Sequence, residues 1–70
     1  MPNFAPQLIQ DMRRALEDVM TKVPAKYATS AVKVYLAECI LKAAAQGHTN
    51  YHDLVGSAAD QIQTAISLFT

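Results

Sequence analysis

Two histidines, His48 and His52, are the residues whose type and spacing most directly suggest chemistry. Histidines four residues apart bind a metal ion when both lie on one helix. Here Gly47 precedes the pair and Asn50, a favoured helix cap, falls between its members, so a continuous helix is not expected. The nearest third ligand would be Asp53. We therefore predict two solvent-facing histidines at a helix entry, with no metal site and no cofactor.

Ser57, His52 and Asp53 are the residue types of a nucleophilic triad. In a triad the base lies between the nucleophile and the acid that orients it. These three residues fall on one short helical segment, where adjacent side chains diverge by about 100° and do not form such a relay. Both glycines of the chain are isolated, so there is no glycine-rich loop to hold a phosphate. The sequence predicts that the protein is not an enzyme.

The chain contains a single cysteine, Cys39, which has no second cysteine with which to form an internal disulfide. It belongs to an apolar series on one side of the middle segment. A cysteine in such a place behaves as a small apolar side chain with an inert thiol. We predict a structural role for it.

Composition indicates one small helical domain. The chain has 70 residues, six cations, six anions and an apolar fraction of 51%. Its charges cancel, so no overall field draws it to nucleic acid or anionic lipid. No apolar run reaches the roughly 20 residues needed to cross a bilayer, and the opening residues do not resemble a signal peptide. We expect a soluble cytoplasmic protein.

Apolar residues recur at helical spacing in three segments. The first predicted helix runs from about Pro6 to Met20, with Pro6 suited to its first turn. The second ends at Gly47 and begins either at Pro24 or, with Thr29 as its cap, at Ser30. The third begins after Asn50 and carries one apolar stripe to Phe69. The stripe of the first helix comprises Leu8, Ile9, Met12, Ala15, Leu16, Val19 and Met20. That of the third comprises Tyr51, Leu54, Val55, Ala58, Ile62, Ala65, Ile66 and Phe69.

The second helix is apolar on two opposite sides, whereas an ordinary surface helix has one apolar side. One side carries Val32, Leu36, Cys39 and Ala43, flanked by Tyr35 and Ile40. The other carries Val34, Ala37, Leu41 and Ala44. A monomer could place this helix between the other two in a layer. Alternatively, both neighbours pack on its wider side and a second subunit covers the other.

We favour the second arrangement, because three helices bury their stripes better around one axis than in a flat layer. The short connections predict that successive helices are antiparallel. The predicted fold class is therefore all-α, an antiparallel three-helix bundle in a single domain spanning residues 1–70. We expect it to be dimeric through the middle helix, with Val34, Ala37, Leu41 and Ala44 as the interface.

A helix, a glycine and a further helix also suggest a helix-turn-helix DNA-binding protein. The third helix opposes this interpretation, because no Lys or Arg follows Lys42 and such a helix has no cation to meet phosphate. Nucleic acid could instead contact the first two helices through Arg13, Arg14, Lys22, Lys26 and Lys33. Acidic residues alternate with these arginines, which is more typical of a solvated face. Nucleic-acid binding is the alternative function.

The segment from Thr29 to Leu54 resembles a motif of short uncharacterised helical bacterial proteins. That motif has a Thr before a helix, a Lys near its start, an Ile-Leu-Lys-Ala-Ala-Ala-x-Gly run at its end and a Leu in the next helix. The matching residues are Thr29, Lys33, Ile40, Leu41, Lys42, Ala43, Ala44, Ala45, Gly47 and Leu54. The chain departs from the family's usual Asp-Pro cap at Asn50-Tyr51. The resemblance implies that Thr29 caps the helix, and it implies no activity.

These patterns favour a non-enzymatic module that acts through protein–protein contact or regulation. Its expected partners are a second copy of itself and another protein that the sequence does not identify. We expect no membrane partner.

Overall fold

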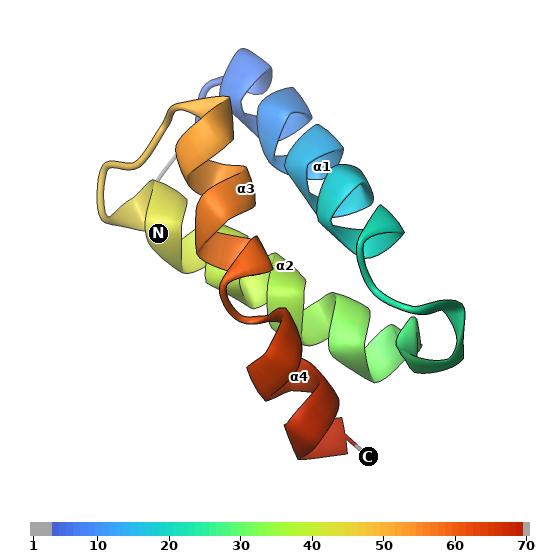
Figure 1. Ribbon diagram of the computed structural model, residues 1–70. Coiled ribbons are helices and arrows are strands. Elements are labelled where there is room, and N and C mark those ends of the chain that lie inside the picture. The colour runs from blue at the N-terminus through green and yellow to red at the C-terminus, as the bar shows by residue number, and fades with distance from the viewer. Residues whose placement is uncertain (1–3, 70) are drawn as a thin grey trace.

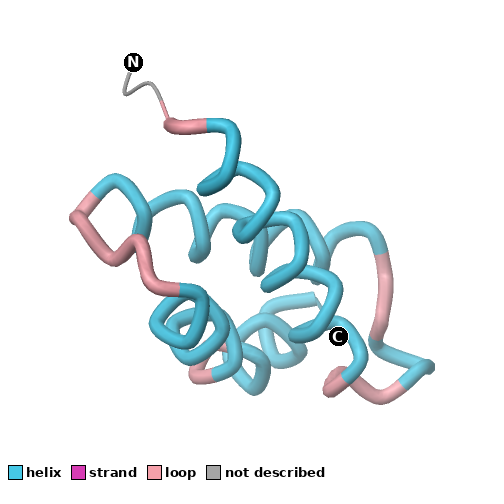
Figure 2. The backbone as a smooth tube through the Cα atoms, turned by 90° about the horizontal axis from the view of Figure 1, so that it is seen from above, coloured by secondary structure: helices cyan, strands magenta, loops and turns pink. Residues whose placement is uncertain are grey.

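The computed structural model describes residues 4–69, and these form helices and short connections with no strand among them. The four α-helices are α1 (Pro6–Thr21), α2 (Ser30–Ala45), α3 (Tyr51–Ala59) and α4 (Ile62–Phe69), and a short 3-10 turn, η1 (Ala25–Tyr27), precedes α2. Figure 1 shows their arrangement, and Figure 2 shows that the connections lie at the outside of the molecule. The described part is elongated, with principal extents of 34 × 20 × 17 Å.

The start of α2 is at Ser30 rather than at Pro24. The Thr29 side-chain oxygen accepts a hydrogen bond from the Val32 N–H at 3.3 Å, which satisfies a donor that would lack an intrahelical partner. Pro24 instead precedes η1, and its carbonyl accepts from the Tyr27 N–H at 2.8 Å. The prediction of Thr29 as the cap is confirmed.

The end of α2 and the start of α3 also follow from local residues. Gly47 has a φ of 101°, the left-handed conformation that glycine adopts without a steric penalty. Its N–H donates to the Ala44 carbonyl and the His48 N–H donates to the Ala43 carbonyl, so carbonyls of the last turn are satisfied. The Asn50 side chain then caps α3 by accepting from the His52 N–H at 2.8 Å.

The prediction of one continuous third helix from Tyr51 to Phe69 is wrong. A turn at Asp60 and Gln61 separates α3 from α4. There the Gln61 N–H donates to the carbonyl of Ala58, three residues back, rather than continuing the four-residue ladder. After this turn α4 packs against α2, whereas α3 packs against both α1 and α2.

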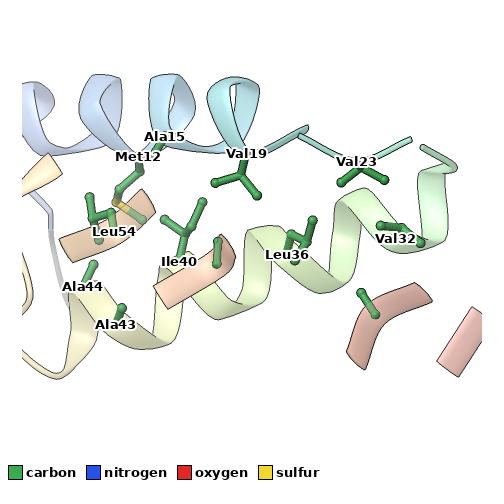
Figure 3. Packing of buried hydrophobic residues seen from close by; sticks show 12 residues of the cluster. Met12, Ala15, Val19, Val23, Val32, Leu36, Ile40, Ala43, Ala44 and Leu54 are labelled. Atoms are coloured by element: carbon green, nitrogen blue, oxygen red, sulfur yellow. The ribbon is translucent and has the colours of Figure 1, made fainter. Parts of the chain in front are cut away.

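The helices α1, α2 and α3 contact one another in all three pairs, so they surround a common core. This excludes the flat layer in which α2 separates the other two. Twelve apolar residues form the core, and no polar or charged side chain is buried among residues 4–69. They are Met12, Ala15, Val19, Val23, Val32, Leu36, Ile40, Ala43, Ala44, Leu54, Ala58 and Ala65 (Figure 3).

Alanines make up five of the twelve core residues. Ala15 on α1, Ala58 on α3 and Ala65 on α4 are each fully buried. A small side chain at a contact allows two helix axes to approach, since the interaxial distance depends on the residues between them. Leu36 and Ile40 on α2 supply larger side chains opposite them. The core therefore uses one face of α2 and leaves another face open.

Candidate functional site

The two histidines lie at the entry of α3 without forming a ligand set. His48 and His52 are both exposed, and the His52 ring makes an edge contact with the Tyr51 ring at a centroid distance of 5.8 Å. Within residues 4–69, no group of three or more His, Cys, Asp or Glu side chains is arranged to hold a metal ion. In the structure the residues around the two histidines form the start of α3, which the Asn50 side chain caps.

Ser57 is half-buried, whereas His52 and Asp53, the other two residues of the possible triad, are exposed. Ser57 lines a shallow hollow between α2 and the α3–α4 segment, together with Tyr35, Cys39 and Gln61. His52 and Asp53 are exposed on the first turn of α3 and do not line this hollow. Among the described residues, no hydrogen bond joins any two of these three side chains.

Cys39 is half-buried beside this hollow. Burial raises the pKa of its thiol above the ordinary value of 9.0, and the nearby Lys42 charge only partly opposes this effect. The thiol is the unreactive form of cysteine, so a raised pKa lowers its reactivity at neutral pH. This environment suits a packing residue.

Tyr35 joins α2 to the last part of the chain, a connection that the sequence did not indicate. Its hydroxyl donates a hydrogen bond to the Gln61 side-chain oxygen at 3.5 Å. Its ring also meets the Phe69 ring edge to face, with centroids 6.2 Å apart and planes at 72°. Through Gln61, this hydrogen bond connects the turn between α3 and α4 to α2.

An apolar groove runs between α1 and α2 and has a volume of about 370 Å³. Its lining is Phe4, Ile9, Met12, Arg13, Leu16, Ala37, Ile40 and Leu41. Arg13 is the one charged residue of this lining. Ile9, which the sequence assigned to the inward stripe of the first helix, is 40% exposed and faces the groove instead. The groove is thus an apolar surface that the core leaves uncovered.

The side of α2 that faces away from the core is also apolar, and it extends the apolar surface of the groove. Val34 is 58% exposed and Leu41 is 47% exposed, while Ala37 between them is half-buried. Beyond Val34 the side chain of Glu38 lines a second hollow together with Phe69 of α4. We call Val34, Ala37 and Leu41 the outer stripe of α2.

Ala44 does not belong to the outer stripe, and the prediction that it faces outward from α2 is wrong. Only 5% of it is exposed, and it packs in the chain's own core. It follows Ile40 by four residues, so it lies on the same helix face as that buried side chain. Of the three remaining residues of the predicted interface, Ala37 and Leu41 line the groove and Val34 lines the second hollow.

The five basic residues considered for nucleic acid, Arg13, Arg14, Lys22, Lys26 and Lys33, are all exposed. Lys22 ends α1, and Lys26 belongs to η1, where its ammonium nitrogen lies 4.9 Å from the centre of the Tyr27 ring. Arg13 differs from the others because it lines the apolar groove.

None of the helices described is long and apolar enough to cross a membrane. A scan against models of protein families finds no match, and neither does a search of curated proteins or of solved structures. The proposed function therefore rests on the surfaces of this chain.

Proposed function

We propose that the protein is a non-enzymatic interaction module that forms a homodimer through the outer stripe of α2. The observation that carries this proposal is the exposure of Val34 and Leu41 on a helix whose opposite face is fully buried. Scattered apolar residues are common on protein surfaces, but Leu41 lines the apolar groove together with Ala37, and Val34 precedes Ala37 by three residues on the same helix face. A surface of this kind is typical of a protein–protein contact.

The size of the chain supports the same proposal. A domain of 70 residues buries a smaller fraction of its surface than a larger one does, and association with a second copy is a common way to gain further burial. The buried core is rich in alanine, which contributes less apolar area than leucine or isoleucine. The proposal also includes an antiparallel order of successive helices, a cytoplasmic location, a bacterial source and a further protein partner that uses the remaining surface.

A substitution at Leu41 tests the interface. In a dimer with two-fold symmetry, Leu41→Glu introduces two carboxylates into one apolar contact, where they lack partners that would offset their desolvation. Leu68→Glu is the matched control, because Leu68 is 61% exposed on α4 and outside the outer stripe. Light scattering should show that Leu41→Glu is a monomer while Leu68→Glu remains a dimer. Folding of both variants is checked by circular dichroism, and a dimeric, folded Leu41→Glu protein would contradict the proposed interface.

The second candidate function is contact with nucleic acid through the exposed basic residues of α1, η1 and α2. It is favoured by the exposure of all five side chains and opposed by Glu17 and Asp18, exposed acidic neighbours on α1. The two functions differ in their response to salt. Binding to phosphate weakens steeply as ionic strength rises, whereas an apolar helix contact does not. Loss of binding to duplex DNA or RNA on Arg14→Glu/Lys22→Glu, two exposed residues that do not line the groove, with the dimer intact, would favour the second function.

A further inference from the structure

The two edges of the outer stripe carry opposite charges. Arg13 of α1 lies on one side, where it lines the groove with Ala37 and Leu41. Glu38 lies on the other side, where it lines the second hollow with Val34 and Phe69. Correspondingly, α1 and α4 lie on opposite sides of α2 (Figure 1). The stripe therefore has a basic edge next to α1 and an acidic edge next to α4.

Lys33 adds a second cation to the basic edge. It is exposed, and it precedes Ala37 by four residues, which places both on one side of the helix. Val34 and Leu41 are seven residues apart with Ala37 between them, the spacing of the first and fourth heptad positions in a coiled coil. In that register Lys33 and Glu38 take the two flanking positions. These are the positions whose charges pair between the helices of a parallel coiled coil.

The relative direction of two copies decides which edges meet. If the two α2 helices are parallel, the two-fold axis runs along them and places the acidic edge of one copy against the basic edge of the other. If they are antiparallel, the axis is perpendicular to the helices and each edge meets its own copy. With Val34 opposite the partner's Leu41, the two Glu38 side chains then lie about 1.5 Å apart along the helix direction. Like charges so placed repel each other.

We infer that two copies of this chain associate with their α2 helices parallel, so that Glu38 of each copy pairs with Lys33 and Arg13 of the other. This inference rests on the proposed homodimer and specifies its geometry. Val34 and Leu41 each meet their own counterpart at the two-fold axis, and the charge pairs flank this apolar contact. The seam is short, because Ala44, which would take the next heptad position, is buried within its own chain.

Replacing Glu38 distinguishes the two directions by the sign of the effect. In the parallel dimer, Glu38→Gln removes an attractive pair from each side and should weaken dimerisation about three- to tenfold. In the antiparallel dimer it removes a repulsion and should strengthen dimerisation. Lys22→Gln is the control, since Lys22 is exposed at the end of α1 and lines neither the groove nor the second hollow. Unchanged or tighter association of Glu38→Gln would overturn the inference.

Disulfide trapping tests the geometry directly, with Cys39→Ser as the background. Val34→Cys and Leu41→Cys should each form a disulfide with its own copy, because each pair meets at the axis at a distance that a disulfide spans. Leu68→Cys should not cross-link. If only a mixture of the Val34→Cys and Leu41→Cys chains cross-links, the helices are antiparallel and the inference fails while the homodimer stands. If the protein is a dimer but none of these cysteines cross-links it, the contact lies elsewhere on the chain and the inference is overturned. If the wild-type protein sediments as a monomer, this result contradicts the proposed homodimer as well as the inference.

Discussion

The Tyr35 hydroxyl donates a hydrogen bond to the side-chain oxygen of Gln61 across 3.5 Å, and this bond links the middle of α2 to the turn between α3 and α4. Tyr35 also contacts the ring of Phe69 near the end of α4. One residue of α2 therefore contacts both ends of the segment that follows α3. The helix α4 has eight residues and one fully buried side chain, Ala65, and the Tyr35–Phe69 ring contact adds to its packing against α2.

Replacing Tyr35 should loosen α4 before the rest of the fold. Tyr35→Phe keeps the ring contact but removes the hydrogen bond, and we expect it to cost no more than about 0.5 kcal/mol, because the O···O distance of 3.5 Å is long for such a bond. Hydrogen exchange should show faster exchange of α4 amides with little change in α1. Phe69→Ala keeps the hydrogen bond but removes the ring contact, and it should have the same local effect. Equal acceleration of exchange in α1 and α4 would show that α4 is not a separately opening unit.

The two glycines should respond in opposite ways to alanine. Gly47→Ala places a side chain at a φ of 101°, where steric strain costs about 1–2 kcal/mol. Gly56 lies inside α3 with open space around it, so Gly56→Ala should stabilise the protein by about 0.5–1 kcal/mol through helix propensity. Thermal unfolding should show a lower Tm for the first variant and a higher Tm for the second. A destabilised Gly56→Ala protein would indicate a close contact at Gly56 that this structure lacks.

The Thr29 cap should contribute about 1 kcal/mol to the free energy of unfolding. Thr29→Ala removes the oxygen that accepts from the Val32 N–H, and Thr29→Ser retains it. Chemical denaturation should therefore show a loss for the first variant and a much smaller change for the second. Thr64→Ala, at an exposed position inside α4, is the control for a threonine without a capping role. Equal losses for Thr29→Ala and Thr29→Ser would show that the cap is not responsible.

Labelling of Cys39 should report its raised pKa. Only the thiolate reacts, and burial favours the neutral thiol, so the pH at half-maximal labelling rate should lie above 9.0. This difference in the pKa of Cys39 makes the free energy of unfolding depend on pH. The stabilising contribution of the Cys39 thiol is fully present below pH 9.0 and is lost as the pH rises through the pKa of the folded chain, because the thiol of the unfolded chain releases its proton more readily. Cys39→Ser removes this dependence. A midpoint at or below 9.0 would contradict the protective effect of burial.

Local chemistry explains which features were predictable from sequence. Thr29, Gly47 and Asn50 act on backbone groups within a few residues. The end of α2 and the start of α3 could therefore be identified without the fold, whereas the start of α2 stayed open between Pro24 and Ser30. The turn at Asp60–Gln61 could not, because neither residue is glycine or proline and the apolar spacing continues across it. In the structure the hydrogen bond from Tyr35 of α2 reaches Gln61 at this turn, a contact between residues far apart in sequence.

The outward surface was predicted only in part for a similar reason. Val34 and Leu41 lie far enough from the buried face of α2 to be exposed. Ala44 and Ile9 lie at the margins of their helix faces, where the position of a neighbouring helix decides burial. The spacing of apolar residues shows which face of a helix is apolar, but it does not show whether a neighbouring helix covers the residues at the margin of that face. The groove between α1 and α2 therefore appears only in the folded chain.

Sedimentation equilibrium of the wild-type protein tests the central claim most directly. The proposed homodimer predicts a mass approaching twice the 7.6 kDa of one chain at tens of micromolar, with dissociation on dilution. The mass at high concentration should change little between low and moderate salt, because the apolar stripe supplies most of the contact. A mass of 7.6 kDa at every concentration would contradict the account and show that the outer stripe of α2 does not join two copies of the chain.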